Sequence, residues 1–138
     1  MTAKEAMARF SGDRFALESA GIKITAVGEK AAECTVHLRP EHLNSIGRPM
    51  GGLLFTLADF CFAVAANSKA MGTVSQAANI TFLSAAQGKT LTARAHCIRD
   101  GHTTCLYQVD VTDETGALVA YVTVGGYHAA LNMEEEQK

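Results

Sequence analysis

The hydrophobic pattern of this chain is dominated by one long apolar stretch, residues 50–67. Only two polar residues, Thr56 and Asp59, lie within the run 53–66, and neither glycine nor proline interrupts it. Leu, Ala, Phe and Met favour helix, and a helix that is apolar nearly all round is buried on most of its faces. The stretch therefore predicts a long central helix inside a protein core. It is too short for a membrane span, which needs roughly 18–20 apolar residues.

Shorter segments in which polar and apolar residues alternate lie on both sides of this helix, and such alternation predicts strands. Two precede the helix and four follow it: 22–27, 32–38, 73–83, 91–99, 103–112 and 117–128. The Asp- and Gly-containing segments 100–101 and 113–116 favour tight hairpin turns. Tight turns join antiparallel neighbours, so the order excludes a parallel Rossmann sheet. We predict an α+β fold in which an antiparallel sheet wraps around the central helix.

The remaining segments fit one domain that spans residues 1–138. Residues 1–14 are expected to form an N-terminal extension that includes a short helix. A second short helix is expected over 14–20, with Asp13 as its N-cap and Gly21 as its C-cap. Residues 129–138, which are rich in glutamate, are expected to form a flexible, solvated tail.

Composition excludes several classes of function. The chain has 48% hydrophobic and 19% charged residues and a net charge of −2. A nucleic-acid-binding domain is usually basic, with its charges in a patch. The first residues lack the apolar core of a signal peptide. We therefore expect a cytoplasmic protein that binds neither nucleic acid nor membrane.

The residues that most often bind metals show no metal-site spacing. The four cysteines have no C-x-x-C pair, and three of them fall in apolar segments, which indicates reduced core residues. The five histidines lack the spacing of zinc ligands as well. No G-x-S-x-G elbow or phosphate-binding glycine loop is present. We expect no metal and no cofactor.

Asp59 is the exception within the apolar helix. A buried carboxylate costs several kcal/mol unless it is paired, hydrogen-bonded or neutralised. One interpretation is a structural aspartate that bonds to backbone or to a subunit contact. The other is a catalytic carboxylate that burial makes more basic. Gly51 and Gly52 favour the second, because a helix N-terminus presents unpaired N–H groups that can stabilise an oxyanion.

The spacing of these groups adds a geometric condition. Asp59 follows Gly51 by eight residues, which is about 12 Å along a helix axis. One aspartate cannot reach a carbonyl held at Gly51 of the same helix. If both groups act on one atom, they come from two antiparallel copies of the helix in a dimer.

A longer motif carries a family resemblance. It comprises the segments Asn44-x-x-Gly47-x-x-Met50-Gly51-Gly52-x-x-Phe55-x-Leu57-Ala58-Asp59 and Asn79-Ile80-x-Phe82-Leu83. Together with the order of elements over residues 15–128, it resembles the hot-dog-fold acyl-CoA thioesterases, and within them the phenylacetic-acid-degradation (PaaI-like) subgroup. The resemblance implies a dimer or a dimer of dimers that hydrolyses acyl- or aryl-acyl-CoA without a metal, with CoA as part of the substrate.

The resemblance also implies roles for individual residues. The Gly51 N–H would polarise the thioester carbonyl, and Asp59 of the other protomer would act as general base or as nucleophile. Asn44 would hold the thioester or the water, and Ser75 would assist the carboxylate. On the residues alone, the favoured interpretations are a loop Asx-turn for Asn44 and a strand hydroxyl that faces solvent for Ser75. Further contacts with the acyl-CoA are expected from Met50, Gly52, Phe55, Phe82, Arg99 and His102.

Met50 departs from the family pattern, in which histidine usually precedes the glycine pair. Methionine makes no useful hydrogen bond, so we expect an altered or slower thioesterase. The missing histidine also argues against the hot-dog dehydratases. Two alternatives stay open: a non-catalytic module that binds acyl-CoA, and a thioesterase that acts on an acyl carrier protein.

Overall fold

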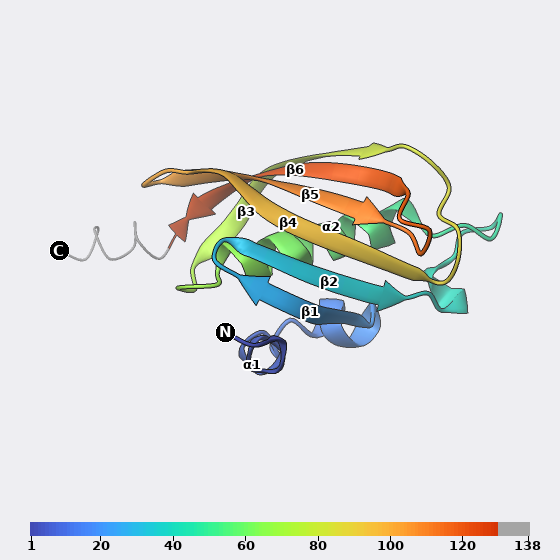
Figure 1. Cartoon of the computed structure of the whole chain (residues 1–138), viewed down its shortest axis with the longest axis horizontal. Helices are drawn as coiled ribbons and strands as arrows, with labels where there is room; N and C mark the ends of the chain where they lie inside the picture. The colour runs from blue at the N-terminus through green and yellow to red at the C-terminus, as the bar shows by residue number, and fades with distance from the viewer. Residues whose placement is uncertain (130–138) are drawn as a thin grey trace.

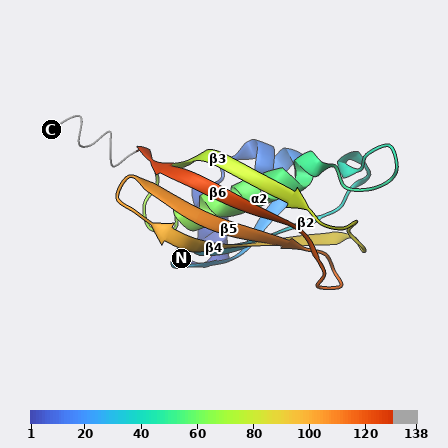
Figure 2. The ribbon, with the colours of Figure 1, turned by 90° about the horizontal axis from the view of Figure 1, so that it is seen from above.

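The computed structural model describes residues 1–129, and six strands in it form one antiparallel sheet. The strand order across the sheet is β1-β2-β4-β5-β6-β3. The strands are β1 Ile22–Gly28, β2 Ala31–His37, β3 Thr73–Phe82, β4 Thr90–Asp100, β5 Thr104–Thr112 and β6 Leu118–His128. The sheet curves over the long helix α2, Gly51–Ala66 (Figures 1 and 2). The predicted helix, the six strands and their antiparallel pairing are thus confirmed, with ends displaced by at most one residue.

Alternation along the strands places one face of the sheet against α2. In β5 the buried side chains are every second residue, Cys105, Tyr107, Val109 and Val111. The predicted hairpin that follows is built by Asp113, whose Oδ1 accepts a hydrogen bond from the Thr115 N–H at 2.9 Å. Such side-chain bonds to the backbone two residues on stabilise turns.

Helix α2 buries nine of its 16 residues against the sheet. The prediction that it is buried on most faces therefore holds for the side toward the sheet. On its other side Gly52 and Phe55 are exposed, and Asp59 and Ala63 are half-buried. Their spacing places them on one stripe of the helix surface. We call these four residues the open stripe.

Strand β3 forms one edge of the sheet, paired with β6 alone among the described residues (Figure 2). Its residues 74–79 are exposed on both faces of the strand. An edge strand with an accessible backbone is a ready template for pairing with another chain. The open stripe and the β3 edge are therefore two surfaces that a second subunit can cover.

The N-terminal segment packs beneath β1. Helix α1, Ala3–Arg9, buries Ala6, and Phe10 beyond it is also buried. The helix expected over 14–20 is a single π-type turn, η1 Phe15–Ser19, closed by a bond from the Ala20 N–H to the Phe15 carbonyl. The predicted Asp13 cap is wrong, because the turn has no side-chain cap. Gly21 follows with φ +72°, which fits its predicted role.

One further short helix lies before α2. A short 3-10 helix, η2 Pro40–His42, lies in the connection from β2 to α2. None of the helices within residues 1–129 is both long and apolar enough to cross a membrane. Of the predicted tail 129–138, residues 130–138 lie outside the described part of the chain.

Candidate functional site

Asp59 lines a cavity of about 390 Å³ between α2, the start of β3 and the N-terminal segment. Part of the wall is apolar and comes from Phe10, Phe62, Met71 and Val74. The polar lining includes Asp13, Asp59, Asn67 and Ser75. The structure thus brings Asp59 together with Ser75, as the resemblance implied. Phe10 and Asp13 belong to the segment that the sequence marked only as an extension.

The surroundings of Asp59 raise the pKa of its carboxyl above the ordinary aspartate value. Burial is the largest cause, because it disfavours the charged form. A hydrogen bond from the Ser75 side chain opposes this rise, and the negative charge of Asp13 adds to it. A carboxylate that is more basic than in water, next to a cavity, is suited to accept a proton from a bound water molecule.

The other candidate group lies at the start of α2. Met50 occupies the N-cap position and makes no side-chain capping bond. The first backbone bonds run from the N–H groups of Leu53 and Leu54 to the Met50 carbonyl, at 2.9 and 3.4 Å. The N–H groups of Gly51 and Gly52 precede this ladder and are therefore available to a ligand. The partial positive charge of the helix N-terminus favours an oxyanion there.

Two smaller cavities flank this helix start. One, of about 260 Å³, is lined by Phe15, His42, Met50, Gly52 and Leu53 among others. The other, of about 230 Å³, includes Arg48, Gly51, Leu54 and Phe82 in its lining. Neither includes Asp59. Within one chain, the helix start and the carboxylate therefore face different cavities, which is the separation that the eight-residue spacing predicts.

Phe82 of β3 lies directly against Gly51. A Cβ atom added at Gly51 would be 3.0 Å from Cζ of the Phe82 ring. Contacts this short force the neighbour to move, so glycine is what allows the ring to approach the backbone here. Phe82 is itself exposed. The two residues that the sequence placed in the site thus meet in the lining of one cavity.

Asn44 organises the loop that leads into α2. Its side-chain Oδ1 accepts hydrogen bonds from the N–H groups of Ile46 and Arg48, at 3.1 and 3.0 Å. This is the Asx-turn that was one of the two interpretations of this residue. Its amide NH₂ group makes no hydrogen bond within residues 1–129, and that group is the one left for a substrate.

Arg99 and His102 lie at the opposite end of α2 from Gly51. Arg99 is the penultimate residue of β4, next to Asp100, and Asp100 pairs with Lys30. The Lys30 N–H in turn donates to Ser68 Oγ just beyond α2. The structure therefore does not bring these two residues to Gly51 of the same chain. Their role in CoA binding stays a prediction.

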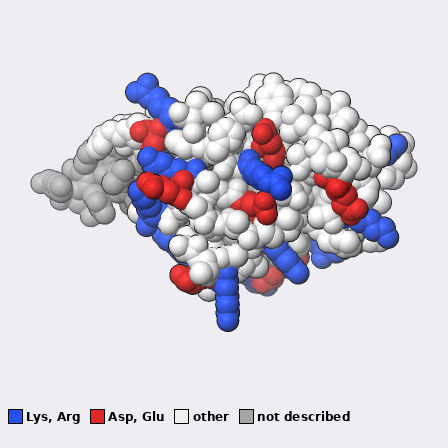
Figure 3. All heavy atoms as spheres, in the orientation of Figure 1, with Lys and Arg blue, Asp and Glu red and all other residues white. Residues whose placement is uncertain are grey.

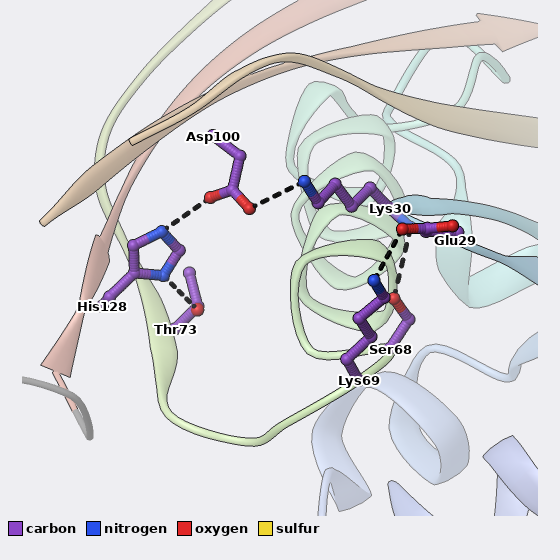
Figure 4. Close-up of polar contacts among 7 residues, drawn as sticks. All are labelled: Glu29, Lys30, Ser68, Lys69, Thr73, Asp100 and His128. Carbon is purple, nitrogen blue, oxygen red and sulfur yellow. Dashed lines mark hydrogen bonds and ion pairs between the residues drawn. The ribbon is translucent and has the colours of Figure 1, made fainter. Parts of the chain in front are cut away.

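Three metal-type donors that the sequence did not group lie together at this end. One ligand atom each of Asp100, Cys105 and His128 lies within 4.8 Å of the others. His128 is hydrogen-bonded through Nε2 to Asp100 and through Nδ1 to Thr73, both at 2.8 Å (Figure 4). Lys30 Nζ lies 3.2 Å from the second Asp100 oxygen. An ammonium so close repels a second cation, so this arrangement is better described as a salt-bridge network.

Charged side chains of both signs are interspersed on the face of the molecule drawn in Figure 3. Ion pairs such as Lys69 with Glu29, at 2.6 Å, and Arg94 with Glu33, at 2.9 Å, are examples of this pairing. Such exposed pairs contribute little to stability.

Comparisons with known proteins bear on the chemistry of this site. A family model described as the thioesterase superfamily matches residues 47–120, from the loop before α2 into β6. Acyl-coenzyme A thioesterase PaaI of Escherichia coli (strain K12) is 34% identical over 118 residues, which cover 85% of this chain and 84% of that protein.

Solved structures agree with the sequence relatives. The structure of the E. coli PaaI protein from the phenylacetic acid degradation operon has a TM-score of 0.84 and 28% identity, covering 91% of this chain and 92% of that one. A hypothetical thioesterase protein with coenzyme A from Streptococcus pneumoniae TIGR4 has a TM-score of 0.79 and 27% identity. It covers 86% of this chain and 94% of its own.

Proposed function

This chain belongs to the thioesterase superfamily and is a thioester hydrolase, and we propose that its substrates are medium-chain or aryl-acyl-CoA thioesters. The resemblance to PaaI-like proteins and the hot-dog fold are confirmed. An acyl-CoA substrate agrees with the name of the E. coli relative and with the coenzyme A in the S. pneumoniae structure. The apolar walls beside Asp59 and beside Met50 support an apolar or aromatic acyl group.

The observation that carries the catalytic proposal is the raised pKa of Asp59 beside a cavity, with Ser75 on its carboxylate. Asp59 takes a proton from water while the water oxygen attacks the thioester carbonyl carbon. The Gly51 N–H of the partner protomer donates to the carbonyl oxygen as it becomes an oxyanion. When the tetrahedral intermediate collapses, the C–S bond breaks and the proton on Asp59 passes to the CoA thiolate. The products are a carboxylic acid and free CoA.

A nucleophilic course is the second possibility for the same residue. Asp59 would attack the carbonyl carbon and expel the CoA thiolate, which leaves a mixed anhydride that water then hydrolyses. A single turnover in ¹⁸O-labelled water separates the two. A general base leaves its own oxygens unlabelled, whereas hydrolysis of the anhydride at the aspartyl carbonyl transfers ¹⁸O to Asp59.

We further propose a homodimer, which can pair into a dimer of dimers. The open stripe of α2 and the exposed β3 edge support this assembly. An antiparallel partner helix would bring Gly51 of one chain toward Asp59 of the other. The four free thiols, Cys34, Cys61, Cys97 and Cys105, support a cytoplasmic location.

The competing function is a module that binds acyl-CoA without hydrolysing it. Met50 favours this alternative, because its thioether takes the place of a histidine at the helix start and 49% of the residue is exposed there. An acyl-carrier-protein thioester is a further alternative to the CoA substrate.

The deciding experiment measures hydrolysis of a panel of medium-chain and aryl-acyl-CoA thioesters by wild type and by Asp59→Asn. We expect turnover by wild type and a loss of about 10²–10⁴-fold in the variant, the usual contribution of a general base. Binding of the panel by both proteins without turnover by either would establish the binding module. Turnover of acyl carrier protein thioesters alone would replace the CoA substrate.

A further inference from the structure

Asn67, the first residue beyond α2, is a buried polar side chain that joins the helix to β3. It is only 4% exposed. Its Nδ2 donates to the carbonyls of Ala63 and Thr73, at 2.8 and 3.0 Å. Its Oδ1 accepts from the N–H groups of Gly72 and Thr73, at 2.9 and 2.8 Å. These four bonds use the whole hydrogen-bonding capacity of the amide.

The two elements that Asn67 joins are the ones that carry Asp59 and Ser75. Ala63 lies one helical turn beyond Asp59 on α2, and Thr73 precedes Ser75 by two residues on β3. All five residues line the same cavity. The amide of Asn67 therefore fixes how far the start of β3 stands from the helix, and with it the reach from the Ser75 hydroxyl to the Asp59 carboxylate.

A second set of contacts holds the side chain of Thr73. Its Oγ1 is bonded to His128, which is bonded to Asp100, which pairs with Lys30 (Figure 4). The side chains of Asp100 and Lys30 are 28% and 41% exposed, so solvent screens their pairing. The bonds of Asn67 are shielded from water, and a buried amide that loses its partners carries the full cost of desolvation. Asn67 is therefore the stronger of the two anchors.

We propose that Asn67 is a positioning residue for thioester hydrolysis, which holds Ser75 against Asp59 through the backbone of Thr73. The inference rests on the proposed function of Asp59. It predicts that Asn67 acts through Ser75. The effects of the two side chains on kcat are therefore coupled, although Asn67 does not bond to Asp59 or to Ser75. A residue that merely supports the fold would not show this coupling.

The test is a double-mutant cycle with Asn67→Leu and Ser75→Ala. Leucine keeps the approximate size of asparagine and removes all four hydrogen bonds. We expect Asn67→Leu to lower kcat several-fold at neutral pH, as much as Ser75→Ala does, because it displaces the same hydroxyl, with little change in KM. The acid limb of the kcat–pH profile should move to higher pH. Adding Ser75→Ala to Asn67→Leu should change neither kcat nor the limb further.

Val36→Ala provides the matched control. Val36 is buried in β2 and does not line the Asp59 cavity, so its truncation destabilises the fold without loosening the joint between α2 and β3. We expect a lower Tm and an unchanged pH profile. If Asn67→Leu and Ser75→Ala are additive in kcat, or if Asn67→Leu leaves the pH limb in place, the proposal is overturned.

Two additions keep the test decisive. If Asn67→Leu does not fold, Asn67→Ser, which retains a hydroxyl for one of the four bonds, enters the same cycle. If wild type hydrolyses no thioester, the proposed function has failed on its own. The link that Asn67 makes between α2 and β3 is then tested by NMR titration of the Asp59 carboxyl. The positioning role is supported if the pKa of Asp59 rises in Asn67→Leu by as much as it rises in Ser75→Ala. An unchanged pKa contradicts it.

Discussion

The Ser75 side chain on β3 and the carboxylate of Asp59 in the middle of α2 line one cavity, where the serine hydroxyl lowers the pKa of that carboxyl. This interaction joins an edge strand to the central helix across that cavity. It stabilises the charged form of a carboxyl that burial pushes toward the neutral form. Burial and the charge of Asp13 raise the pKa of Asp59, Ser75 lowers it, and the balance sets how basic the carboxylate is.

Removal of the Ser75 hydroxyl should raise the pKa of Asp59 further, because the hydrogen bond lowers it. A proton acceptor works only when it is deprotonated, so the acid limb of the kcat–pH profile moves to higher pH in Ser75→Ala. We expect kcat at neutral pH to fall by several-fold. Ser75→Thr, which keeps a hydroxyl, is the control. A limb that moves downward in Ser75→Ala would contradict the assigned sign.

Asp59→Asn should stabilise the protein at neutral pH even as it removes activity. A carboxyl whose pKa is raised by folding destabilises the native state at pH values above that raised pKa, where it is charged. The penalty is relieved as the pH falls through the raised value toward the ordinary 3.8. We expect the free energy of unfolding, measured in urea, to rise by on the order of 1 kcal/mol at pH 7. This gain should shrink as the pH is lowered. A gain that does not depend on pH would show a different cause.

Gly51→Ala should lower activity by displacing a neighbour as well as by crowding the oxyanion position. The new methyl group would lie 3.0 Å from the Phe82 ring. We expect kcat to fall by about 10-fold or more, up to the roughly 10²–10³-fold that removal of one oxyanion donor costs. Phe82→Ala in the same chain should restore part of the loss. Gly12→Ala is the control, because a Cβ at Gly12 meets nothing within 4 Å and Gly12 lies outside the site.

Met50→His should increase kcat. The imidazole supplies a hydrogen-bond donor at the N-cap of α2, where the methionine thioether supplies none. We expect a gain of up to about 10-fold, since a neutral hydrogen bond contributes roughly 1 kcal/mol. Met50→Leu should behave as wild type in steady-state kinetics. A loss of activity in Met50→His would show that the apolar side chain itself binds the substrate.

A site shared between two protomers can be tested by mixing inactive variants. Asp59→Asn and Gly51→Val each damage a different half of the site. After subunit exchange at equal amounts, half of the dimers are mixed, and each mixed dimer holds one intact site of two. About a quarter of wild-type activity should return. If no activity returns although mass spectrometry shows mixed dimers, both groups act within one chain.

The sequence by itself determined the elements and the order in which they occur. The apolar run of α2, the alternation in β5 and the turn at Asp113 are local patterns. Such patterns fix which residues face the core whatever the rest of the chain does. The separation of Gly51 from Asp59 along one helix also followed from spacing alone, because helical rise is constant.

Only the tertiary structure decided which distant residues meet. Nothing in the spacing of Asn67, Thr73 and His128 predicts that one amide and one imidazole hold the start of β3. The same is true of Phe10 and Asp13, which enter the Asp59 cavity from a segment that the sequence marked as an extension. These contacts depend on how the chain folds back across the sheet, and side-chain pairs so far apart in sequence leave no periodic signal.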